Sequence, residues 1–192
     1  MSKIRLIVGL GNPGSKYQDT RHNAGLWMLE QLAYQYNVTL RAESKFNGNI
    51  ARIQSNNIDA LLLFPTGFMN CSGLSVSKVL KFYKIPPEEV LIIHDEIDLD
   101  PGTIRLKEGG GHGGHNGLRS INDHLGTNNY YRLRLGIGHP GNKDIVANYV
   151  LSPASKDQKS KINSAIDSAM IDINTIIQGD FQKAMNNIHQ NN

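Results

Sequence analysis

The 192-residue chain has little of the chemistry on which extracellular and membrane proteins depend. Cys71 is its only cysteine, so no disulfide can form within the chain, and a reducing cytoplasm is the expected compartment. The longest apolar runs, such as residues 60–64, are far shorter than the about 20 residues of a membrane-spanning helix. The N-terminal apolar stretch is too short for a secretory signal. These absences predict a soluble cytoplasmic protein without a membrane partner.

Charge is also sparse and nearly balanced, with 19% charged residues and a formal net charge of +3 at pH 7. The basic surplus lies in residues 1–50 and 101–150, each with six Lys and Arg against three Asp and Glu. Both segments contain glycine-rich stretches. A surplus this small is compatible with solubility alone, but its coincidence with glycine loops favours a partner that carries phosphate.

Hydrophobic periodicity predicts alternating strands and helices. Strands are expected at residues 3–8, 46–53, 58–64, 90–93, 103–106 and 132–137, and helices at 23–36, 74–83, 118–125 and 156–177. This alternation is typical of an α/β fold in which helices cover both faces of the sheet. Without a linker or an internal repeat, we expect one domain, residues 1–192, that ends in a helical segment at about 154–190.

Polar segments follow four of the apolar runs, at residues 9–23, 65–72, 94–102 and 107–117. In α/β sheets, functional sites gather in the loops beyond the C-terminal ends of the strands. These loops contribute Asn12, His22, Asn70, Asp95 and Asn116 to one expected site.

The segment GLGNPG, residues 9–14, has the G-x-G-x-x-G spacing of a dinucleotide-binding turn. In that motif the third glycine opens a helix at once, so that amides meet the pyrophosphate. Here Pro13 lacks an N–H donor, and the polar, aperiodic SKYQDTRHN follows Gly14. The second strand also ends without an acid for a ribose hydroxyl. The glycines are therefore interpreted as a tight turn that presents Asn12.

A His22–Asp95 pair would supply a general base. The carboxylate of such a pair fixes the imidazole tautomer and stabilises its protonated form. Cys71 and Ser72 offer a nucleophile, but no G-x-S-x-G elbow is present, and water is the simpler group to activate. Asparagines suit this chemistry because an amide can donate and accept hydrogen bonds, hold a peptide backbone or stabilise an oxyanion.

A metal site is the rival interpretation. Ligand types are plentiful in this part of the chain: His94, Asp95, Glu96, Asp98, Asp100, His112 and His115. No H-x-x-x-H or H-E-x-x-H spacing is present, however, and alternate strand residues face opposite sides of a sheet. Interpretation of Glu96, Asp98 and Asp100 as a solvated acidic turn is favoured over a metal site.

The segment GGGHGGHNG, residues 109–117, has six glycines in nine residues. It is a flexible loop, and so many small residues permit close approach of another backbone and gating. Lys107 precedes it and Arg134 lies on a later strand. Each cation alone is an ordinary surface residue, but a pair that flanks a glycine loop could grip a phosphate.

Taken in series, six segments resemble the bacterial peptidyl-tRNA hydrolases in order and spacing. They are GLGNPG, TRHNAG, PTGFMNCSG, HDEIDLDPG, GGGHGGHNG and RLRLGIGHPG. The resemblance is dense over about the first 150 residues and loose over the helical tail. It implies a single α/β domain with a twisted, mixed and mostly parallel sheet, monomeric and without metal or cofactor. It also implies hydrolysis of the ester between a peptide and the 3′-terminal ribose of tRNA.

The resemblance also implies roles for single residues. His22 matches the general base, Asp95 its supporting carboxylate, and Asn12 the residue that helps to distinguish peptidyl from free aminoacyl substrates. Asn70 and Asn116 match substrate-binding positions near the attacked carbonyl, and His115 is also expected to bind substrate. Tyr17, Phe68 and Met69 match positions that contact the tRNA end or line the cleft. Lys107 and Arg134 match a pair that clamps the tRNA 5′-phosphate. No DNA or membrane partner is implied.

Two departures from the family pattern stand out. After Lys183 the tail has no Lys or Arg, whereas relatives often end in a basic helix, which puts tRNA contact by the extreme C-terminus in doubt. Cys71 lies where relatives commonly have an apolar residue, which favours a packing role. A non-catalytic RNA-binding module and a metal-dependent hydrolase remain the alternatives.

Overall fold

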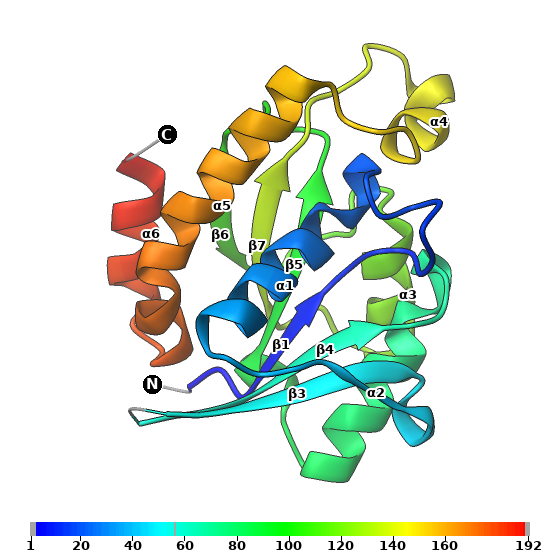
Figure 1. Ribbon diagram of the computed structural model, residues 1–192. Coiled ribbons are helices and arrows are strands. Elements are labelled where there is room, and N and C mark those ends of the chain that lie inside the picture. The colour runs from blue at the N-terminus through cyan, green and yellow to red at the C-terminus, as the bar shows by residue number, and fades with distance from the viewer. Residues whose placement is uncertain (1–2, 56, 191–192) are drawn as a thin grey trace.

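The chain is described from a computed structural model that covers residues 3–55 and 57–190. Residues 1–2, 56 and 191–192, which belong to the predicted domain, lie outside the described residues. One twisted seven-stranded sheet forms the centre of the molecule, with strand order β2-β3-β4-β1-β5-β7-β6 (Figure 1). The strands are β1 Leu6–Gly9, β2 Arg41–Glu43, β3 Gly48–Ser55, β4 Ile58–Pro65, β5 Val90–Glu96, β6 Ile104–Glu108 and β7 Tyr131–Gly136.

The four central strands, β4, β1, β5 and β7, are parallel to one another. Antiparallel strands complete the sheet at both ends, where β3 pairs with β4, β2 with β3, and β6 with β7. This is the α/β class with a mixed sheet that the sequence predicted, and parallel pairing fills its centre.

Helices cover both faces of the sheet, as predicted. The helices are α1 Ala24–Gln35, α2 Ser72–Tyr83, α3 Asn116–Leu125, α4 Val146–Val150, α5 Lys156–Ile177 and α6 Phe181–Gln190. One apolar core lies between the sheet and α1, α5 and α6, and a second lies between the sheet and α2 and α3. Successive strand residues alternate between the two cores: Leu6 and Val8 face α2 and α3, and Ile7 faces α1.

The alternation of strands and helices was predicted correctly, but several boundaries were not. β5 continues to Glu96, so that His94 and Asp95 lie within the strand and not in a loop after it. Phe46 belongs to a short 3₁₀ helix and precedes β3. Neither β2 nor α4 was predicted, since three and five residues are too few to show periodicity. No helix opens at Gly14, and α1 begins only at Ala24, which agrees with rejection of the dinucleotide motif.

The C-terminal segment consists of two helices that pack side by side (Figure 1). α5 begins with a capping box formed by Ser155 and Gln158. α6 lies along the edge strand β6, where the ring of Phe181 stacks on Tyr131 at 3.6 Å and His189 accepts a hydrogen bond from the N–H of Leu106. Covering an edge strand in this way protects its unpaired backbone groups. Among the described residues, none of the helices combines the length and apolar character that crossing a membrane requires.

Candidate active site

His22 and Asp95 come from segments that the fold brings together at the C-terminal ends of β1 and β5. His22 lies in a 3₁₀ turn, Arg21–Asn23, directly before α1. Gly25, in the first turn of α1, allows this approach, because a Cβ at that position would overlap the carbonyl oxygen of Ile93 on β5. The guanidinium of Arg21 fixes the turn from the other side by donating to the carbonyl oxygens of Tyr149 and Ser152.

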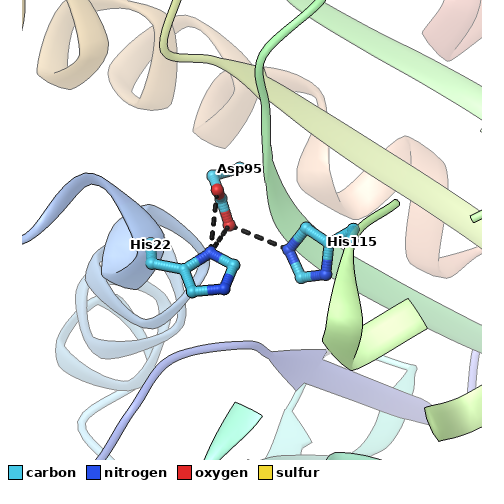
Figure 2. A group of neighbouring side chains, drawn as sticks. All are labelled: His22, Asp95 and His115. Atoms are coloured by element: carbon cyan, nitrogen blue, oxygen red, sulfur yellow. Dashed lines mark hydrogen bonds and ion pairs between the residues drawn. The ribbon is translucent and has the colours of Figure 1, made fainter. Parts of the chain in front are cut away.

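Asp95 lies between two histidines (Figure 2). Nδ1 of His22 is 2.9 Å from each carboxylate oxygen of Asp95, and Nε2 of His115 is 2.9 Å from one of them. His22 and Asp95 are both buried, and the His115 side chain is only 10% exposed. The sequence predicted contact between His22 and Asp95. It did not predict that His115 would share the carboxylate.

Burial and charge act in opposite directions on this cluster. Burial lowers the pKa of His22, but the charge of Asp95 and its hydrogen bond outweigh burial, so the pKa of His22 is raised above its ordinary value. Burial would raise the pKa of Asp95, but the neighbouring His22 and His115 hold that pKa well below its usual range. Asp95 is therefore ionised at neutral pH, and His22 has an anionic partner whenever it takes up a proton.

The proton positions on His115 follow from its second role. Its Nδ1 accepts hydrogen bonds from the backbone N–H groups of Gly117 and Leu118, which makes His115 the N-cap of α3. A nitrogen that accepts carries no proton, so the proton of neutral His115 lies on Nε2, which donates to Asp95. His115 thus joins the first turn of α3 to the carboxylate.

The same arrangement bears on metal binding. The cluster offers three ligand atoms that all lie within 4.8 Å of one another, one each from His22, Asp95 and His115. Two histidines and a carboxylate are a ligand set that zinc accepts. A cation on Nε2 of His115 would displace its proton, however. That proton could move only to Nδ1, where it would break both cap bonds of α3. The cluster therefore fits protons better than a metal ion.

His94 is the remaining buried histidine near this cluster. Its Nδ1 is 2.7 Å from the carbonyl oxygen of Asp95, and its ring lies 5.1 Å from that of His115. Burial, together with the neighbouring His115, lowers the pKa of His94 to about 3. His94 therefore stays neutral at the pH values at which His22 titrates, and it supports the backbone of Asp95.

Asn12 is held so that only part of its amide is available. Its backbone exchanges two hydrogen bonds with the side chain of Asn23, and its Oδ1 accepts the N–H of Met69 at 2.7 Å. Its Nδ2 has no partner among the described residues. Asn12 therefore presents a hydrogen-bond donor to the site, and the acceptor half of the amide is used to anchor the loop that carries Asn70.

The other predicted residues fall into two groups. Asn70 and Asn116 are exposed at the ends of two segments that Met69 and Gly117 bring into contact. Tyr17 and Phe68 form an edge-to-face pair with ring centroids 6.2 Å apart, and Phe68 is 59% exposed, whereas Met69 is buried. Cys71 is exposed and contacts Asn70, which contradicts the prediction of a packing role.

A cavity of about 410 Å³ lies beside the histidine cluster. It is lined by His22, Asp95, Glu96, Ile97, residues 112–116, His139, Lys143, Val146, Ala147 and Val150. Sequence reasoning gave no role to His139 and missed the wall formed by residues 143–150, because that stretch follows the RLRLGIGHPG segment and has no motif of its own. A larger hollow of about 770 Å³ at the opposite end of β1 contains none of the candidate residues.

Lys107 and Arg134 lie on one face of the β6–β7 pair but do not face each other. Lys107 is opposite Arg132, and Arg134 is opposite Arg105. Nε of Arg134 is 3.0 Å from Glu96. The interpretation of Glu96 as part of a solvated acidic turn is therefore wrong, although Asp98 and Asp100 are exposed.

Comparisons with known proteins identify the family to which the chain is similar. The family model described as peptidyl-tRNA hydrolase matches residues 6–192. A peptidyl-tRNA hydrolase of Francisella tularensis subsp. novicida (strain U112) is 55% identical over 189 residues, 98% of this chain and 99% of that protein. One from Actinobacillus pleuropneumoniae serotype 5b (strain L20) is 51% identical over 190 residues, 98% of each. The crystal structure of peptidyl-tRNA hydrolase from Acinetobacter baumannii matches with a TM-score of 0.95 and 53% identity, covering 98% of this chain and 95% of that one.

Proposed function

The chain belongs to the peptidyl-tRNA hydrolase family, and we propose that it uses His22 as the general base to hydrolyse the ester between a peptide and the 3′-terminal ribose of tRNA. The observation that carries this proposal is the contact of His22 Nδ1 with both oxygens of Asp95. This contact keeps the proton of neutral His22 on Nδ1 and leaves Nε2 as a proton acceptor.

In the proposed mechanism, Nε2 of His22 takes a proton from water as the water attacks the ester carbonyl. Asp95 stabilises the imidazolium that forms, because it is a buried, ionised acceptor. The tetrahedral intermediate collapses with departure of the ribose oxygen, which takes up the proton. An ester is labile enough for activated water, so no covalent intermediate is needed.

We assign substrate binding to the asparagines. Asn12 offers the N–H of its amide, which suits a carbonyl oxygen of the peptide. A free aminoacyl ester has an ammonium group in place of the first peptide unit, and so would leave that donor unpaired. Asn116, which lines the cavity, and Asn70, which is exposed at the end of the neighbouring segment, are proposed to bind the substrate and stabilise the developing oxyanion.

The tRNA end would lie along the exposed rim of the site. Tyr17 and Phe68, with buried Met69 beneath, offer an aromatic surface for the terminal nucleotides. Lys107 and Arg134 are proposed to contact the 5′-phosphate. The reaction would return tRNA to translation in the cytoplasm, and a monomer supplies every residue that the mechanism uses.

The defining test is a cleavage assay on N-acetyl-aminoacyl-tRNA. We expect release of the N-acetyl amino acid and intact tRNA. We expect cleavage of aminoacyl-tRNA with a free amine to be slower by at least about tenfold, since Asn12 then loses its acceptor. Acid-gel electrophoresis and quantification of the released amino acid measure both products.

The same assay separates the alternatives. Protein that has been treated with EDTA and then dialysed is expected to keep its rate, whereas a metal-dependent hydrolase would lose it. A non-catalytic RNA-binding module would bind the acylated tRNA and release nothing. Binding without cleavage would contradict the proposal.

His115 is proposed as a positioning residue for Asp95, and replacement by asparagine tests this role. Asparagine is a good N-cap, so α3 should keep its first turn, but it is too short to reach the carboxylate. Without that donor, Asp95 orients His22 less well. We expect kcat to fall about tenfold, with little change in Tm.

His115→Ala is the matched comparison, because it removes both the cap and the contact with Asp95. It should show the same loss of kcat as His115→Asn, together with a loss of stability of about 1 kcal/mol from the missing cap. If His115→Asn keeps the full kcat, His115 acts only as a cap and does not position Asp95.

A further inference from the structure

Arg132 is a buried cation that the proposed mechanism does not use. It lies on β7, is only 4% exposed, and faces Lys107 across the β6–β7 pair. On this same face, Arg134 has Glu96 as its partner. Arg132 has no acidic partner at ion-pair distance among the described residues, and its buried Nε has no hydrogen-bond partner there. Burial of such a group is costly, which calls for a specific role.

The guanidinium of Arg132 is directed at the start of the glycine loop. Nη1 donates to the carbonyl oxygen of Gly111 at 2.9 Å, and Nη2 donates to that of Gly109. The amide of Asn128 holds the carbonyl oxygen between them, that of Gly110, at 3.2 Å. Three successive carbonyl groups are thus fixed by side chains beneath the loop.

Fixing these carbonyl groups also fixes the direction of the N–H groups. All peptide bonds described are trans, so the N–H of each peptide points opposite to its carbonyl. The N–H groups of Gly110 and His112 therefore point away from Arg132, and they have no acceptor among the described residues. Lys107 reaches the same glycine, since a Cβ at Gly110 would be 3.1 Å from Lys107 Nζ and would overlap the Arg132 guanidinium.

We propose that Arg132 is a positioning residue that shapes loop 109–112 into a phosphate-binding site, in which the N–H groups of Gly110 and His112 and the Nζ of Lys107 contact the anion. The buried charge of Arg132 attracts that anion without touching it. This inference rests on the proposed function for the source of the phosphate, which is either the 5′-terminal phosphate or a backbone phosphate of the tRNA.

Arg132→Lys tests the role of the guanidinium, because lysine keeps the charge but cannot hold two carbonyl groups. We expect KM for N-acetyl-aminoacyl-tRNA to rise roughly tenfold and kcat to stay within about twofold. The slope of log KM against log salt should flatten by about one unit, as for loss of one phosphate contact. Arg105→Gln is the control on the same face, since Arg105 does not contact the loop.

A second pair of variants leaves the buried arginine in place. Gly110→Ala would push a methyl group into the guanidinium, and Gly110 has a φ of +97° that alanine tolerates poorly. Gly111→Ala is the matched control, because its Cβ would meet nothing within 4 Å. We expect Gly110→Ala to reproduce the KM increase of Arg132→Lys, and Gly111→Ala to resemble the parent protein.

A substrate without its 5′-phosphate identifies which phosphate is bound. If the site holds the terminal phosphate, the parent protein should show the same KM increase on this substrate, and Arg132→Lys should add nothing further. If the site holds a backbone phosphate, Arg132→Lys should raise KM equally on both substrates. An unchanged KM in both Arg132→Lys and Gly110→Ala would overturn the proposal, as would an equal effect of Arg105→Gln. Loss of the parent protein's cleavage would instead contradict the proposed function.

Discussion

Replacement of His22 by glutamine is expected to lower kcat for N-acetyl-aminoacyl-tRNA by about 10²–10⁴-fold, with KM nearly unchanged. Glutamine can donate an amide N–H to Asp95, so the buried carboxylate keeps a partner and the fold is preserved. Its neutral amide cannot take a proton from water at any pH used in the assay. The loss of kcat therefore measures removal of the general base and not a change in the fold.

The pH profile provides a second, independent readout of the same variant. The pKa of His22 is raised above its ordinary value of 6.5, and only neutral His22 is a base. The kcat/KM of the parent protein should therefore fall as the pH drops through a value above 6.5. The residual kcat/KM of His22→Gln should not show this decrease on the acid side. His124→Gln is the control, because that ring is hydrogen-bonded to the carbonyl oxygen of Ser120 on α3 and not to Asp95. A His22→Gln variant that retains near-normal turnover would contradict the assignment.

The sequence was sufficient for the fold class because the predicted strands have apolar runs or apolar residues that alternate with polar ones, and each long helix has a regular apolar stripe. The helix at residues 156–177 was predicted to the residue, since its apolar period lasts for six turns. β5 was predicted too short because its last residues, His94, Asp95 and Glu96, are polar. The carboxylates of Asp95 and Glu96 are satisfied by tertiary partners, namely His22, His115 and Arg134, which a local pattern cannot reveal.

The role of a site residue could be predicted where its position in the sheet determines that role. It could not be predicted where the role depends on a tertiary partner. His22 and Asp95 follow or end apolar strands, so the topology of an α/β sheet is enough to bring them together. The second role of His115 as an N-cap has no sequence signal, because histidine is not among the preferred caps. Arg132 and Arg134 look equivalent in the alternating RLRLG segment. Only the structure distinguishes the one paired with Glu96 from the one buried beneath the glycine loop.

Asp95→Asn is expected to lower kcat by about 10²–10⁴-fold although it preserves shape almost perfectly. Asp95 accepts N–H donors at both oxygens, from His22 at each and from His115 at one. An amide offers a single oxygen, and the cap of α3 keeps the proton of His115 on Nε2. His115 therefore donates its Nε2–H to the amide oxygen of the new asparagine, and the NH₂ group of that asparagine faces His22. His22 must then accept at Nδ1 and carry its proton on Nε2, so the atom that should take a proton from water already has one.

The pH profile of Asp95→Asn should shift in a direction that distinguishes this explanation from a general disruption of the site. The charge of Asp95 and its hydrogen bond are what raise the pKa of His22, and burial alone lowers it. Without the carboxylate, the pKa of His22 falls below 6.5, so the acid limb of the residual kcat/KM shifts to lower pH while the plateau drops. Titration of the His22 ring by NMR measures the same shift without turnover. A limb that stays above pH 6.5 in this variant would mean that Asp95 does not control His22, and the general-base assignment would then lose its physical basis.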